Sequence, residues 1–209
     1  MRMVEGTVLS LINGADGEWD ATVVDAVKKG GVLFCVAQTK PLQMPPDVWF
    51  IFAPFLKERT PFIVEKATEL GAAKIMPVQT AYTNNADRIR VDKLRAHALE
   101  ATEQCGGTYV PEVTDLEKLS KVLASWDPTR KIMFCDETLL GEPSALTQTD
   151  EGPWAILIGP EGGFSDKERE QLRNLPFAHP VSLGPRILRA DTAAVAALTL
   201  WQSALGDRA

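Results

Sequence analysis

Two stretches near the end of the chain share one build, and this repetition constrains the fold more than any other feature. In each, a short apolar run, at residues 155–158 or 181–183, predicts a buried strand that stops at a Gly-Pro step. A helix signal follows each step. Two strand ends that feed a glycine turn and then a helix are typical of an open α/β sheet, which binds ligands at that edge.

The residues after the two Gly-Pro steps predict where the helices begin. Ser165 is a favourable N-cap, and Glu168 three residues later completes a capping box. After the second step, Asp191 and Thr192 are cap-type residues that open an Ala-rich helix over residues 191–205. Each turn alone is equally compatible with an ordinary strand–helix connection. Two such turns in tandem favour a binding site.

Glycine is the common residue of both turns, and it lets the backbone approach a ligand without a Cβ in the way. The glycines concerned are Gly159, Gly162, Gly163 and Gly184. Backbone amides and carbonyls in such turns can bind the edge of an adenine. Arg186 and Arg189 beside the second turn add positive charge.

Composition places the chain among soluble globular proteins. Its 209 residues are 45% hydrophobic and 24% charged, enough apolar material for a sizeable core. No run approaches the roughly 18 apolar residues that a membrane span requires. Three unevenly spaced cysteines and two histidines favour reduced thiols in the cytoplasm over a zinc site, and we expect no metal. The net charge of −6 argues mildly against a general nucleic-acid coat.

The first forty residues differ in pattern from the rest. Residues 4–11, 19–27 and 32–38 predict three strands of a small antiparallel unit, separated by turn signals. A proline-containing connector at 40–46 marks a domain boundary, which we place between residues 44 and 45.

From residue 45 to the end, strands and helices alternate, which predicts a mostly parallel sheet with helices on both faces. We expect strands at 48–53, 74–78 and 131–135. We expect helices at 60–70, 92–105 and 116–125.

Several other patterns do not define a site. The glycine turn at 159–163 is neither a P-loop nor a dinucleotide fingerprint. His97 and His179 are isolated, which favours a surface or core position over a catalytic role for each. The charged residues at 57–59, 66 and 69 fit a solvated face or a phosphate-binding patch equally well. Glu100, Glu103 and Gln104 share one helix face, which favours a structural network.

The segments LIGPEGGFSDKE (157–168) and SLGPRILRADTAAVAAL (182–198) together resemble the bacterial ribosomal small-subunit RNA (uracil-N3)-methyltransferases of the SPOUT, or trefoil-knot, superfamily. The segments KATELGAAKIMPV (66–78) and EATEQCGG (100–107) support the resemblance. It covers residues 45–209 strongly.

The resemblance implies a knotted α/β domain over 45–209 and a PUA-like β-barrel that helps to bind RNA over 1–44. The family's barrel usually has an additional opening segment, so we expect a truncated barrel here. A deep knot is an exception to ordinary chain topology, which periodicity does not predict. The resemblance further implies a homodimer with the site at or near its interface.

S-adenosylmethionine is the cofactor that the resemblance implies, and two loops would hold it. The implied cofactor-binding residues are Leu157, Ile158, Gly159, Pro160, Glu161, Gly162, Gly163, Leu183, Gly184, Ile187 and Leu188.

The implied reaction is methylation of N3 of a specific uridine in 16S ribosomal RNA, with the small ribosomal subunit as partner. Arg189 first and Arg186 second are the candidates to stabilise negative charge on the uracil. Asp191 would accept the proton or orient Arg189, or it is only the N-cap of the last helix. Two alternatives stay open: a non-catalytic RNA- or ribosome-binding protein with the same fold, and methylation of another RNA such as tRNA.

Overall fold

The computed structural model describes residues 3–28, 30–55, 59–84, 89–141 and 152–207. The chain divides into two compact units. Met1–Met44 with Thr102–Val110 form the N-terminal unit, and Pro45–Ala101 with Pro111–Ala209 form the C-terminal unit. The first unit therefore contains nine residues, 102–110, that are distant from it in the sequence.

The N-terminal unit contains a three-stranded antiparallel sheet in the order β1-β2-β3. Its strands are β1 (Val8–Ile12), β2 (Glu18–Val27) and β3 (Gly30–Lys40). The first strand begins four residues later than predicted, because residues 4–7 form a turn that is closed by a hydrogen bond from Thr7 N to Val4 O, 3.0 Å. The outer strand β3 is exposed along its whole length.

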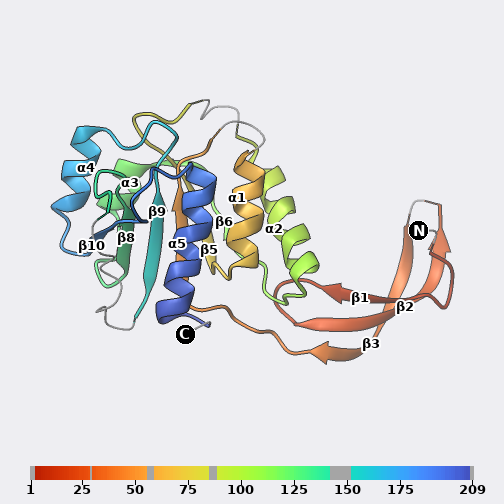
Figure 1. Ribbon diagram of the computed structural model, residues 1–209. Helices are drawn as coiled ribbons and strands as arrows, with labels where there is room; N and C mark the ends of the chain where they lie inside the picture. Colours follow the sequence, from red (N-terminus) through yellow and green to blue (C-terminus); the bar gives the residue numbers. More distant parts are fainter. Residues whose placement is uncertain (1–2, 29, 56–58, 85–88, 142–151, 208–209) are drawn as a thin grey trace. The chain divides into compact units, whose positions relative to one another are not determined.

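The C-terminal unit is built on a parallel sheet, as the strand–helix alternation predicts (Figure 1). The strand order is β10-β8-β9-β4-β5-β6, every recorded pairing is parallel, and β7 also pairs with β5. The strands are β4 (Val48–Phe52), β5 (Lys74–Gln79), β6 (Glu112–Val113), β7 (Glu117–Lys118), β8 (Lys131–Cys135), β9 (Trp154–Ile158) and β10 (Ala178–Val181).

Helices cover both faces of this sheet, which confirms the expected layering (Figure 1). They are α1 (Arg59–Glu69), α2 (Val91–Cys105), α3 (Leu119–Ala124), α4 (Asp166–Arg173) and α5 (Ala190–Leu205). Alternate residues of β4 separate the two core clusters: Phe50 and Phe52 pack with α1, α2 and α5, and Ile51 packs with α3 and α4.

Helix α5 is fixed against the end of α1 by a buried glutamine. The Gln202 side chain has no exposed surface, and its Nε2 donates to the Leu70 carbonyl at 2.7 Å. Its Oε1 accepts a hydrogen bond from the Asp207 amide at 3.1 Å. Both ends of the amide are thereby satisfied inside the core.

Element boundaries in the C-terminal unit also differ from the sequence prediction. The strand expected at 181–183 is β10, which ends at Val181. The helix expected at 116–125 is limited to α3, because Glu117 and Lys118 pair with β5 as a short strand instead. The last helix begins at Ala190, one residue early, with Arg189 at the N-cap.

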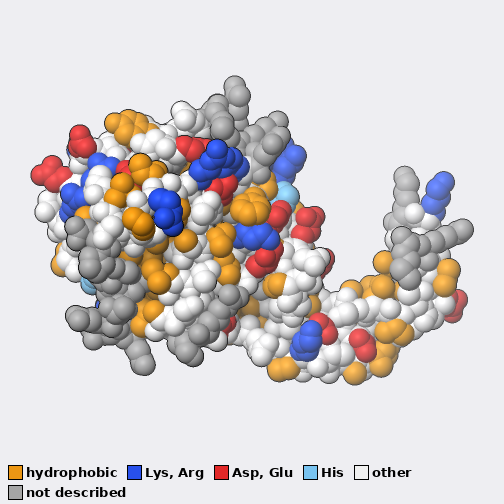
Figure 2. Space-filling model, viewed as in Figure 1, with side chains coloured by type: hydrophobic (Ala, Val, Ile, Leu, Met, Phe, Trp, Pro, Cys, Tyr) orange, Lys and Arg blue, Asp and Glu red, His pale blue; other side chains and the backbone are white. Residues whose placement is uncertain are grey.

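The surface carries both signs of charge, and Figure 2 shows acidic and basic side chains interspersed on the visible face. Large apolar side chains are exposed on the three-stranded sheet: Val8, Val24, Val27, Val32, Leu33, Phe34 and Val36. Among the described residues, no helix is both long and apolar enough to cross a bilayer.

Candidate functional site

A pocket of about 540 Å³ lies at the carboxyl ends of three neighbouring strands, β8, β9 and β10. The loops after these strands form most of its wall, and the first residues of α1 and α5 complete it. A volume of this size lies within the roughly 300–1,000 Å³ that small-molecule sites occupy. The tandem turns of the sequence analysis therefore meet at a single cavity.

Most of the predicted cofactor and catalytic residues line this pocket. They are Ile158, Gly159, Pro160, Glu161, Gly163, Leu183, Gly184, Arg186, Ile187, Leu188 and Arg189. Three others do not line it. Leu157 is fully buried in the core on the α3–α4 side of the sheet, and Gly162 lies against Tyr82. Asp191 contacts a pocket residue rather than the pocket itself.

Two glycines of the wall have backbone conformations that other residues rarely adopt. Gly184 has φ +109°, and a Cβ at this position would meet no atom within 4 Å, so a side chain would extend into open space. Gly163 has φ +69°, and a Cβ there would overlap the Glu137 carboxylate. The positive φ favours glycine at position 163, and a side chain there would displace the Glu137 carboxylate from its present position.

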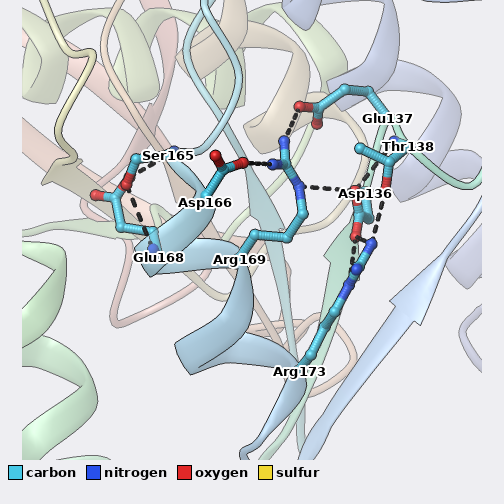
Figure 3. Close-up of polar contacts among 8 residues, drawn as sticks. All are labelled: Asp136, Glu137, Thr138, Ser165, Asp166, Glu168, Arg169 and Arg173. Atoms are coloured by element: carbon cyan, nitrogen blue, oxygen red, sulfur yellow. Dashed lines mark hydrogen bonds and ion pairs between the residues drawn. The ribbon is translucent and has the colours of Figure 1, made fainter.

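The helix after the first turn begins as predicted. Ser165 is the N-cap of α4, its hydroxyl accepts from the Glu168 amide at 3.3 Å, and the Glu168 carboxylate accepts from the Ser165 amide at 3.0 Å. This capping box, drawn in Figure 3, fixes the direction in which the chain leaves the pocket wall.

The third wall of the pocket, the loop after β8, is absent from the sequence prediction. It contributes Cys135, Asp136, Glu137 and Leu140. A signal for it existed, because two adjacent carboxylates directly follow a predicted strand at 131–135. That strand, β8, lies between β9 and β10, and only this sheet order places its loop beside the two glycine turns.

Two arginines of α4 fix the β8 loop (Figure 3). The Asp136 side chain is fully buried and accepts from Arg173 Nε at 3.0 Å and Nη2 at 2.5 Å. It also accepts from the amide and hydroxyl of Thr138, at 3.0 and 2.8 Å. Arg169 Nη2 donates to Glu137 at 2.6 Å. Arg169 Nε lies 3.3 Å from Asp136, close enough for charge attraction although not aligned as a hydrogen bond.

The charge states in this wall follow from its contacts. Burial by itself would raise the pKa of Asp136, but the hydrogen bonds from Thr138 and Arg173 hold the pKa below its ordinary value. Burial raises the pKa of the neighbouring Cys135 thiol to about 12, so the sulfur is protonated and not a nucleophile at neutral pH.

Of the three roles that the sequence suggested for Asp191, the structure favours neither the N-cap of α5 nor the orientation of Arg189. It is not the N-cap of α5, because Arg189 occupies that position. Its Oδ2 forms an ion pair with Arg59 Nη1 at 2.6 Å, and its Oδ1 accepts from the Thr192 amide at 2.8 Å. Asp191 therefore directs Arg59, a pocket residue, instead of Arg189.

Arg186 and Arg189 are exposed at the pocket, and within the described part of the chain neither guanidinium has a hydrogen bond or an ion pair. Between them Ile187 is 75% exposed. These three residues line the pocket, which therefore presents two cations without a protein partner and one apolar side chain to a ligand. We call this part of the pocket its mouth.

The remaining sequence candidates lie away from the pocket. His97 lies 2.8 Å from Glu65, and His179 packs against the Trp154 ring at 5.2 Å. Lys66 is paired with Glu69 at 2.6 Å, which removes it from the possible phosphate patch. Residues 57 and 58 of that patch lie outside the described residues.

Residues 43–202 match the family described as RNA methyltransferase domain. The chain belongs to this family. Its resemblance to the ribosomal small-subunit RNA methyltransferases is also confirmed by individual relatives. Ribosomal RNA small subunit methyltransferase E of Buchnera aphidicola subsp. Schizaphis graminum is 35% identical over 161 residues, which are 72% of this chain and 62% of the relative. The aligned part is thus less than two thirds of that relative's length.

Solved structures share the fold. A Legionella pneumophila protein described as a methyltransferase, in complex with the cofactor SAM, is 28% identical, covers 98% of this chain and 86% of its own, and has a TM-score of 0.84. A ribosomal RNA small subunit methyltransferase E from Neisseria gonorrhoeae, bound to S-adenosyl methionine, has a TM-score of 0.86 at 23% identity, with 99% and 87% of the two chains covered.

Proposed function

We propose that the protein is an S-adenosylmethionine-dependent methyltransferase that modifies N3 of a uridine in 16S ribosomal RNA of the small subunit. The observation that carries the proposal is the single pocket formed by both glycine turns, with Arg186 and Arg189 at its mouth. Relatives named ribosomal RNA small subunit methyltransferase E, and related structures with bound S-adenosylmethionine, support the same reading.

The pocket residues fit this cofactor. Glycine turns expose backbone amides and carbonyls for an adenine edge, and Leu183, Ile187 and Leu188 offer apolar contacts for its faces. Gly184 leaves open space where any other residue would place a side chain. Carboxylates and apolar groups together suit a ligand with a flat ring, hydroxyl groups and positive charge.

When bound, S-adenosylmethionine supplies an activated methyl group. The pocket loops contribute by holding the target nitrogen in line with it, and such positioning lowers a barrier by roughly 7–11 kcal/mol in favourable cases. N3 of uracil carries a proton, so its loss places negative charge on the ring and its carbonyl oxygens. The unpaired guanidinium of Arg189, with Arg186 second, is suited to stabilise that charge. The target base must be unstacked to enter the pocket.

Arg59 adds a third cation to this mouth. Because Asp191 holds it at 2.6 Å, its charge is partly compensated and its position is fixed. We assign Arg59 to positioning the RNA, and we assign Asp191 to orienting Arg59. Proton acceptance by Asp191 is then a poorer role, since its carboxylate is already engaged.

Three finer features belong to the same proposal. We propose that the C-terminal segment is threaded as a trefoil knot, as the family resemblance implies. We propose that the three-stranded unit is part of a PUA-like RNA-binding barrel. We also propose a homodimer that brings two such sites together.

The test is a titration of S-adenosylmethionine into the purified chain, followed by transfer of a labelled methyl group to small ribosomal subunits from cells that lack the modification. We expect binding and one labelled N3-methyluridine per subunit, located by nuclease digestion and mass spectrometry. Binding without transfer to either subunits or free RNA would indicate a non-catalytic RNA-binding protein. Label on tRNA alone would overturn the proposed substrate.

A further inference from the structure

Glu137 occupies an unusual position in the pocket wall. It comes from the β8 loop, and its side chain is 36% exposed in the cavity. Its Oε1 accepts a hydrogen bond from Arg169 Nη2 at 2.6 Å, and the missing Cβ of Gly163 makes room for it. Within the described part of the chain, its Oε2 accepts no hydrogen bond, so one oxygen is anchored and the other remains available.

The charge of Glu137 is partly compensated by its ion pair with Arg169. Arg169 and Arg173 face Asp136 and Glu137 across the wall, two cations against two carboxylates, and Asp166 adds a fully exposed carboxylate at 3.2 Å from Arg169 (Figure 3). A carboxylate that already has a guanidinium partner is a poor counter-ion for an ammonium group. It remains a good acceptor for neutral hydroxyl donors.

We infer that Glu137 binds the ribose hydroxyl groups of the cofactor, an assignment that rests on the proposed S-adenosylmethionine pocket. Carboxylates that accept from ribose hydroxyls recur in nucleotide sites on parallel sheets, because the vicinal diol offers two donors to one acceptor group. Here the acceptor comes from the loop after β8, the strand that lies between β9 and β10, and both of these strands lead into glycine turns. Arg169 is its positioning residue.

The assignment is tested by calorimetric titration with S-adenosylhomocysteine and its 2′-deoxy and 3′-deoxy analogues. In the unaltered protein we expect removal of at least one hydroxyl to weaken binding roughly tenfold or more. Glu137→Gln should weaken binding of the parent compound similarly and should bind the deoxy analogue no worse than the parent. Such non-additivity identifies a direct contact.

The matched control is Asp166→Asn, which removes another carboxylate partner of Arg169 but none from the pocket. It should retain wild-type affinity for all three compounds. Equal affinity of the unaltered protein for the parent and both deoxy analogues would overturn the assignment without any variant. The assignment would also be overturned if the loss of affinity caused by Glu137→Gln simply added to the loss caused by removing the hydroxyl.

5′-Methylthioadenosine separates the ribose from the amino-acid end, because it keeps the sugar and lacks the ammonium group. We expect Glu137→Gln to weaken its binding by the same factor as that of S-adenosylhomocysteine. If Glu137→Gln weakens the binding of S-adenosylhomocysteine but not that of methylthioadenosine, Glu137 binds the ammonium group instead. If the unaltered protein binds none of these compounds, the proposed pocket itself fails, an outcome distinct from failure at Glu137 alone.

Discussion

Single residues set the shape of the pocket through the backbone as much as through side-chain chemistry. Gly184 and Gly163 hold positive φ values that a Cβ would strain, and both line the cavity. Arg186 and Arg189 contribute through their side chains, because each carries a positive charge that has no partner among the described residues. The site therefore combines rigid backbone loops with cations that are free to meet a ligand.

Replacement of Gly184 by valine should abolish S-adenosylmethionine binding, with a loss of more than about tenfold in affinity by calorimetry. The new side chain would extend into the cavity, and a φ of +109° is unfavourable for a β-branched residue. Gly106→Val is the control, because Gly106 has φ +70° with equally open space but lies outside the pocket. Equal loss in both variants would show that backbone strain alone is responsible.

Replacement of Arg189 by alanine should retain cofactor binding and lower methyl transfer by about 100-fold or more, the usual effect of removing one charge-stabilising donor. Single-turnover transfer and calorimetry on the same preparation measure the two properties. Full transfer by Arg189→Ala would contradict this role, and a parallel Arg186→Ala variant would show whether its neighbour serves instead.

Two elements hold the pocket in place, the β8 loop and the helix pair α1–α5. The β8 loop is attached to α4 through Asp136 and its two arginines. Helix α5 is attached to the end of α1 through Gln202. Both attachments join segments that are distant in the sequence, so each stabilises the fold and the site together.

Asp136→Asn should lower the free energy of unfolding at pH 7 and reduce its dependence on acid pH. The folded pKa of Asp136 lies below its ordinary value of 3.8. Its contribution is therefore present above the unfolded pKa and is lost as pH falls through the lower folded pKa. Urea unfolding at a series of pH values from 7 down to about 2 measures this loss of stability, because the linkage acts below the unfolded pKa. An unchanged acid slope in the variant would contradict the assigned linkage.

Gln202→Leu should destabilise the protein by about 1–3 kcal/mol, because it leaves the Leu70 carbonyl and the Asp207 amide without their partner. Gln104→Leu is a suitable comparison, since Gln104 is an exposed residue of α2. Its effect should stay within about 0.5 kcal/mol. Chemical denaturation measures the free energy of unfolding of both variants. An equal loss of stability in Gln202→Leu and Gln104→Leu would contradict the structural role assigned to Gln202.

At the scale of the whole molecule, the parallel sheet determines where chemistry occurs. Its strand order places the ends of β8, β9 and β10 side by side, and the pocket lies at that edge. Large apolar side chains at the cavity, Leu140 at 46% and Ile187 at 75% exposure, suit a partner surface. This agrees with the homodimer that the family resemblance implies.

The protein should accordingly sediment as a dimer at micromolar concentration, measured by analytical ultracentrifugation. Leu140→Glu should shift the equilibrium toward monomer, because a carboxylate in an apolar contact is costly to desolvate. A fully active monomer at the concentration of the transfer assay would contradict the proposed assembly.

The sequence alone predicts the alternation of the longer strands and helices, the parallel sheet, the capping box at Ser165 and the two glycine turns of the site, but not the short strands β6 and β7. These features depend on periodicity, capping and glycine, which act over a few neighbouring residues. The family resemblance, carried by the two turns together, also required only the sequence.

The packing of distant segments was needed to show that the β8 loop completes the pocket, that β10 ends at Val181 and that Asp191 pairs with Arg59. The Asp191–Arg59 contact joins residues 132 positions apart. Adjacent carboxylates at 136 and 137 have the same local sequence whether or not their strand lies between β9 and β10. Sheet order and long-range pairing depend on how distant segments pack, and local sequence patterns do not predict that packing.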